Sequence, residues 1–135
     1  MLRRDFISKI IEQMVNAIAR LIKIDIEKEQ EQFLEDFDEF LHTYFQLSDA
    51  DLALLTEENE GRDGLLLNEN LKDQLIHLFV NAGLVFQNNH QTEKAKNCLK
   101  IIERIQNQHS GVYTFPNDGS GKVLSKIEEL KSLLS

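Results

Sequence analysis

The amino-acid sequence predicts an all-α protein of about five to six helices. Apolar residues recur at helical spacing along nearly the whole chain of 135 residues, whereas sustained period-2 alternation is absent. One proline and six glycines argue against a turn-rich all-β protein. With 41% hydrophobic residues and one cysteine, we expect a single helical domain whose core needs no disulfide and no structural zinc.

The N-terminal segment, residues 1–56, predicts an antiparallel helix pair followed by a short helix. The apolar stripe of the first helix, over about residues 4–24, is Ile7, Ile11, Met14, Ile18 and Leu21. The stripe of the second helix, over about residues 27–47, is Phe33, Phe37, Phe40, Tyr44 and Leu47. Ser48 and Asp51 then have the spacing of a capping box ahead of the short, leucine-rich helix.

The stretch EENEGRDGLLL at residues 57–67 is acidic and contains two glycines. Because it lacks a periodic apolar face, we expect an exposed acidic loop that separates the N-terminal helices from residues 68–135. Proteases should cut this loop first, near Arg62.

The C-terminal segment, residues 68–135, begins with two further helices. Asn68 or Asn70 caps the first of them. The inner face of that helix is Leu71, Leu75, Leu78, Phe79, Ala82 and Phe86. A turn at 88–90 leads into a helix over about residues 92–108.

Residues 109–121 contain the only proline, and we expect a loop there. Ser120 is the expected cap of a last helix, whose apolar face is Val123, Ile127, Leu130 and Leu134. The run Gly119-Ser120-Gly121-Lys122 invites comparison with a phosphate-binding loop. Pro116 stands where such a loop needs its first glycine, and Val123 replaces the Ser or Thr, so we expect no nucleotide site.

The two helices of residues 68–108 resemble a single tetratricopeptide repeat. Gly83 and Ala95 take the small positions of that repeat. Phe86 takes its aromatic position, and Leu99 takes the large apolar position of the second helix. Two positions depart from the pattern, since His90 replaces the usual turn glycine and Ile102 replaces a second small residue. The resemblance implies a helix pair that packs closely at Gly83 and Ala95, with a further helix as its cap.

The opening stretch, RRDFISKIIEQMVNAIARLI, resembles the start of a small uncharacterised bacterial helical family with a tetratricopeptide-like C-terminal part. That resemblance implies a bacterial, cytoplasmic protein, and it brings no catalytic residues. The acids and bases that interrupt this opening argue against a signal peptide. A cytoplasmic location also fits the single free thiol.

The net charge of −8 argues against nucleic acid as a partner, because phosphate binding needs clustered Lys and Arg. The acids are concentrated in residues 25–73, where the net charge is −13, between basic flanks of +3 and +2. This acidic middle faces either a basic partner or the chain's own basic flanks, and the second arrangement is favoured.

No group of residues in the sequence forms a catalytic or metal-binding pattern, so we expect no catalytic residue, cofactor or metal. Glu39 and His42 make one E-x-x-H on a polar helix face, whereas di-iron bundles need two such pairs. The other histidines, which lack partners at ligand spacing, are His77, His90 and His109. Cys98 falls on an inner helix face and is expected to be a buried apolar residue.

Two surfaces are candidates for binding. Lys96, Lys100 and Arg104 form a basic ridge at every fourth position of one helix, which would receive an acidic partner or remain solvated. The first helix has more apolar residues than one neighbour covers. We therefore expect a homodimer through the residues outside its main stripe, which are Ile10, Val15, Ala19 and Ile22.

These observations favour a non-enzymatic protein–protein interaction or scaffold protein whose partner is another protein. The alternative is a small-ligand-binding protein or enzyme that uses a pocket between helices. A third hypothesis is association with a membrane surface through the basic first helix, although the absence of tryptophan and the acidic total charge argue against it.

Overall fold

The computed structural model describes residues 2–108 and 118–135, with side chains for residues 8–108 and 123–135. This part of the chain is helical and contains no strand, which confirms the all-α fold class. Its helices are α1 (Leu2–Ile22), α2 (Gln30–Phe45), the 3₁₀ helix η1 (Asp49–Thr56), α3 (Glu60–Leu66), the 3₁₀ helix η2 (Glu69–Leu71), α4 (Lys72–Asn88), α5 (Thr92–Gln108) and α6 (Asp118–Leu134).

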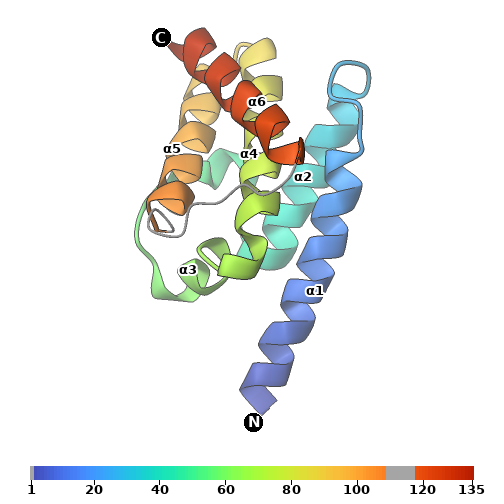
Figure 1. The fold of residues 1–135 in the computed structure, drawn as a ribbon, viewed down its shortest axis with the longest axis vertical. Helices are drawn as coiled ribbons and strands as arrows, with labels where there is room; N and C mark the ends of the chain where they lie inside the picture. The colour runs from blue at the N-terminus through green and yellow to red at the C-terminus, as the bar shows by residue number, and fades with distance from the viewer. Residues whose placement is uncertain (1, 109–117) are drawn as a thin grey trace.

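Helix α4 is the centre of the molecule and contacts α1, α2, α5 and α6. Figure 1 shows α1 and α2 running antiparallel on one side of α4 and α5 on the other, while α6 crosses over α4 and α5. An α-helix surrounded in this way must be apolar around most of its circumference. Ten residues of α4 are accordingly buried, and Asn81 is the one polar side chain among them.

An aromatic cluster joins α2 to α4. The rings of Phe33 and Phe37 stack with centroids 5.8 Å apart, as expected for residues one helical turn apart on a buried stripe. Phe37 also meets Phe79 and Phe86 of α4 edge-on, at 5.8 and 6.1 Å. Such edge-to-face pairs stabilise a core beyond the area that they bury.

The apolar stripe of α1 is buried over only part of its length. Met14, Ile18 and Leu21 are inaccessible or nearly so, whereas Ile10 and Ile11 are half-buried. Figure 1 explains the difference, because the first turns of α1 extend beyond the ends of the other helices. We call residues 2–13 the α1 arm.

The prediction of an exposed loop over residues 57–67 was wrong, because residues 60–66 form α3. The side chain of Asn59 caps this helix by accepting a hydrogen bond from the backbone N–H of Arg62 at 3.0 Å. Leu66 is fully buried in the common core. Sequence periodicity missed α3 because so short a helix needs only one inward-facing apolar residue and its cap.

Three further predictions concern the ends of helices. α5 has the predicted bounds, and Ser48 and Asp51 form the predicted capping box at η1. Ser120 does not cap α6, because α6 already begins at Asp118. The rest of the predicted loop, residues 109–117 with His109, lies outside the described residues.

The helix pair α4–α5 turns through a left-handed residue, and that residue is His90 with φ of 63°. This is the position at which the sequence replaces the expected glycine, so the turn geometry is kept without it. Gly83 is indeed a point of close approach, but its neighbours differ from the prediction. A Cβ at Gly83 would lie 2.6 Å from Leu130 Cδ2 of α6 and 3.4 Å from Cys98 Cβ of α5, rather than near Ala95.

Candidate functional site

The predicted basic ridge is split by the fold. Arg104 turns inward: its guanidinium donates to the backbone carbonyls of Leu55 and Glu57 at 2.9 and 3.2 Å. The same group forms a bidentate ion pair with Asp63 of α3 at 3.0 and 3.3 Å. Lys96 and Lys100 remain exposed on α5. The structure therefore leaves two lysines of the ridge on the surface and places the arginine in a contact within the chain.

The Arg104–Asp63 contact changes the acidity of Asp63. Partial burial acts to raise the pKa of this carboxyl group, but the hydrogen bonds from Arg104 and from the backbone N–H of Asn59 outweigh it. The net result is a pKa below the usual 3.8. A second ion pair joins Lys94 of α5 to Asp49 of η1 at 3.3 Å. For these two acids, the favoured pairing of the acidic middle with the chain's own basic flank is confirmed.

The predicted dimer residues lie along α1 with unequal exposure. Ile10, Val15 and Ile22 are half-buried against the rest of the chain, and Ala19 is exposed. The apolar residues outside the main stripe are thus only partly covered by neighbouring helices.

The residues weighed for chemistry lie apart from one another. Glu39 and His42 are both exposed on α2. Cys98 is fully buried, and burial raises the pKa of its thiol well above the ordinary range, so this group is an apolar core residue. Among the described residues, no three His, Cys, Asp or Glu side chains gather closely enough to hold a metal ion.

The best candidate site is a groove that the sequence did not indicate. It has a volume of about 670 Å³ and lies between the α1–α2 connection (residues 23–29), α4 and α6. Its apolar walls are Ile22, Ile24, Ile26, Leu84, Val85 and Leu133. Its polar lining is Lys23, Asp25, Glu27, Gln30, Asn81, Gln87, Asn88, His90, Lys126 and Glu129. We call it the α4–α6 groove.

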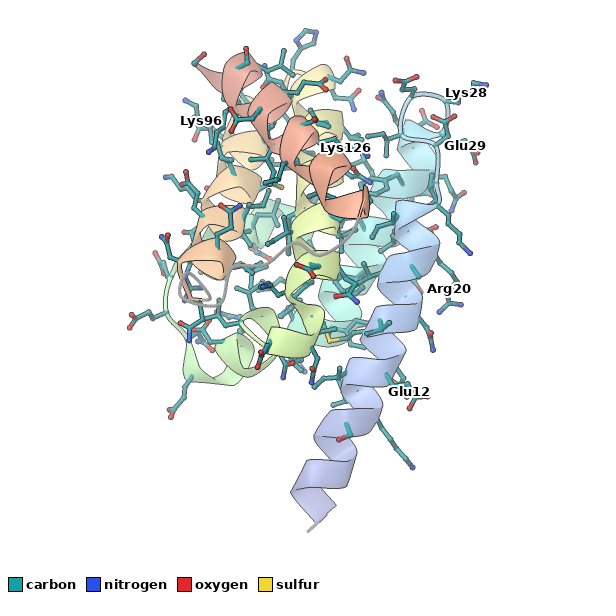
Figure 2. All side chains as sticks on the ribbon, viewed as in Figure 1. Glu12, Arg20, Lys28, Glu29, Lys96 and Lys126 are labelled. Carbon is teal, nitrogen blue, oxygen red and sulfur yellow. The ribbon has the colours of Figure 1, made fainter. Side chains whose placement is uncertain are left out.

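A buried polar contact stands at the base of this groove. Lys126 Nζ of α6 donates to Asn81 Oδ1 of α4 at 3.0 Å, and it lies 3.5 Å from Nε2 of His77. Asn81 is only 1% exposed. Figure 2 shows Lys126 where α6 crosses α4, with Lys28 and Glu29 on the α1–α2 connection in the same upper part of the view. Because a buried amide needs a partner, this contact fixes α6 on α4.

Gln87 adds a second polar feature to the groove. Its Oε1 atom is buried and has no hydrogen-bond partner among the described residues. Buried acceptors are nearly always satisfied, by protein, water or ligand. The charges of the lining nearly balance, since Asp25, Glu27 and Glu129 stand against Lys23 and Lys126. The groove therefore suits a group that donates N–H bonds to the Gln87 acceptor.

Sequence reasoning missed this site because its residues are distant along the chain. Asn81 of α4 and Lys126 of α6 are 45 residues apart in the sequence. One signal was present in each helix: a polar side chain at a position that the apolar spacing places on an inner face. Asn81 falls between Leu78 and Ala82 of the α4 face, and Lys126 lies three residues after Val123.

Comparison of the chain with models of protein families, with curated proteins and with solved structures found no match. Within the described residues, no helix is long and apolar enough to cross a membrane.

Proposed function

We propose that the chain is a non-enzymatic interaction protein that binds a segment of another protein chain in the α4–α6 groove. The observation that carries the proposal is the lining of the groove, in which apolar walls surround a fixed polar base. Protein interfaces have this composition, with an apolar centre and a polar, hydrated rim. The Asn81–Lys126 hydrogen bond holds the two walls together before any partner arrives, which reduces the entropic cost of binding.

The helix pair α4–α5 supports the same proposal. By sequence the pair resembles a tetratricopeptide repeat, and its two helices come close together between Gly83 and Cys98. Helix pairs of this kind present surfaces for binding. The exposed Lys96 and Lys100 offer an acidic partner a second contact on α5, away from the groove.

A small-molecule ligand is the second candidate occupant of the same groove. A volume of about 670 Å³ lies within the range of small-molecule sites. The two occupants differ in size, so native mass spectrometry of the protein purified from its host separates them. A small molecule adds a fixed mass to the chain and leaves on denaturation, whereas a protein partner adds a second polypeptide.

Leu133 offers a sharp test of the proposed function. It lines the groove and is 51% exposed, so Leu133→Glu should fold normally. Leu124 is a matched control, because it is 37% exposed on α6 but does not line the groove. Each variant would be used to capture partners from the native host, with identification by mass spectrometry.

We expect Leu133→Glu to lose the partner that wild type and Leu124→Glu retain. Reversal of both Lys96 and Lys100 to Glu tests the basic ridge separately. If Leu133→Glu keeps every partner while the ridge variant loses one, binding occurs at the ridge, and the groove proposal is wrong.

A further inference from the structure

We propose that Asp63 is a site of spontaneous covalent modification, where aspartate rearranges to isoaspartate when α3 opens, and that Arg104 slows this reaction. The proposal does not depend on the proposed function, since it concerns α3 and not the α4–α6 groove. Asp63 is followed by Gly64, and glycine in this position favours the rearrangement because it has no Cβ to hinder attack. The contacts of the Asp63 carboxylate, the short length of α3 and the open space around Gly64 support the proposal.

The reaction is intramolecular and needs only water as a second reagent. The backbone nitrogen of Gly64 forms a bond to Cγ of Asp63, and its proton leaves with the hydroxyl of the protonated acid as water. The product is a five-membered succinimide ring. Water then opens the ring: attack on Cγ restores aspartate, whereas attack on the former main-chain carbonyl breaks its bond to the Gly64 nitrogen. In the second case the chain continues through Cβ and Cγ as isoaspartate, with no change in mass.

The contacts of Asp63 in the folded chain oppose this reaction. Its Oδ1 and Oδ2 accept hydrogen bonds from Arg104 at 3.3 and 3.0 Å, and Oδ2 also accepts from the backbone N–H of Asn59 at 3.1 Å. Side chains of a helix point toward its N-terminus, so Cγ approaches the nitrogen of Gly64 only after these bonds break. Although partial burial acts to raise the pKa of Asp63, the hydrogen bonds lower it, which depletes the protonated acid that releases water.

The helix that contains Asp63 opens at low cost. α3 has seven residues, and a helix this short is not stable by itself. Gly61 and Gly64 lower its helix propensity further. Leu66 is its one fully buried side chain, and Figure 1 shows α3 at the edge of the molecule. Segments with so few buried contacts open locally without global unfolding, so the contacts of Arg104 largely determine how often Asp63 is released.

The space around Gly64 provides a variant that separates the chemistry from the fold. A Cβ at Gly64 would meet no atom within 4 Å. Alanine therefore fits at this position, where it raises helix propensity and hinders attack on Asp63. Gly64→Ala should fold as wild type does and form little isoaspartate.

Peptide mapping by chromatography and mass spectrometry measures isoaspartate at residue 63 after prolonged incubation at neutral pH. Arg104→Ala should form it at least about fivefold faster than wild type, because the lost contact raises the open population of α3. Arg104→Lys keeps the charge but not the bidentate contact and should lie between the two. Adding Gly64→Ala to Arg104→Ala should suppress the reaction. Lys100→Ala, exposed on the same helix as Arg104, is the matched control and should react as wild type does.

Asp118 and Gly119 serve as an internal reference, since they are the other Asp-Gly pair of the chain and lie at the start of α6. Arg104→Ala should leave the rate at Asp118 unchanged, and the chain unfolded in guanidinium chloride gives the unprotected rate of both pairs. No gain at residue 63 in Arg104→Ala, or no isoaspartate there even in the unfolded chain, would overturn the inference. An equal gain at both pairs, in Arg104→Ala and Arg104→Lys alike, would also overturn it, because the whole chain and not α3 then opens.

Discussion

Lys126 Nζ lies 3.0 Å from Oδ1 of Asn81 and joins α6 to the central helix through a polar contact within an apolar surrounding. The two partners differ in what each loses when the other is removed. Asn81 is 1% exposed and cannot turn to water, whereas Lys126 is only half-buried.

Lys126→Met should therefore lower the free energy of unfolding by about 1–3 kcal/mol, because it keeps the apolar stem but leaves a buried acceptor unsatisfied. Adding Asn81→Leu in the same chain should recover part of this loss, since both polar groups are then gone. Urea denaturation measures the free energy of unfolding of the wild type, of each single variant and of the double variant. Lys131→Met is the exposed control on α6. Equal losses from Lys126→Met and Lys131→Met would show that the contact adds nothing to stability.

The close approach of α6 to Gly83 predicts a second effect on stability. A Cβ there would lie 2.6 Å from Leu130 Cδ2, and Leu130 is fully buried, so its side chain has little room to move. Gly83→Leu should destabilise the protein by about 1–3 kcal/mol through overpacking. Leu130→Ala in the Gly83→Leu background should cost less than Leu130→Ala alone, because the smaller residue makes room. Strict additivity of the two changes would contradict the close approach of α4 and α6.

The lowered pKa of Asp63 predicts a dependence of stability on pH. Because the pKa of the folded state lies below the usual 3.8, the contact stabilises the protein above about pH 4 and is lost as the pH falls through the folded pKa. Asp63→Asn should cost about 1 kcal/mol at neutral pH, a modest value because the side chains of Arg104 and Asp63 keep 18% and 21% of their surface exposed, so solvent still screens the pair. The difference from wild type should vanish in acid. A difference that is unchanged down to pH 3 would exclude this origin.

The bond after Arg62 tests the packing of α3 directly. It lies inside a helix held by the buried Leu66 and by the Asp63–Arg104 ion pair, so trypsin should cut it slowly. Arg104→Ala should speed this cleavage by releasing the ion pair. Fast cleavage at Arg62 in wild type would instead support the exposed loop that the sequence predicted.

The contrast between α5 and α3 shows what the sequence could predict. α5 has a long periodic stripe, and its bounds were predicted correctly because periodicity over several turns determines them. α3 is held by Arg104, which lies 41 positions from Asp63 along the chain. No local pattern contains such a contact, and two glycines in a short acidic stretch favoured a loop.

Prediction of the binding surfaces from sequence met the same limit, because it could not show which helices pack together. The sequence placed Gly83 at a close helix contact but could not assign it to Leu130 of α6, because the crossing of α6 is set by tertiary packing. The basic ridge was correctly spaced on α5, yet Arg104 turned toward carbonyl groups that only the fold brings near. Periodicity determines which face is buried, but not which helix covers it.

Partner capture by wild type, Leu133→Glu and Leu124→Glu tests the central claim most directly, since it shows whether another protein binds in the α4–α6 groove. Each chain serves as bait in an extract of the native host, and the bound proteins are compared by quantitative mass spectrometry. The account predicts a partner that wild type and Leu124→Glu retain and that Leu133→Glu loses. Retention of every partner by Leu133→Glu would contradict it.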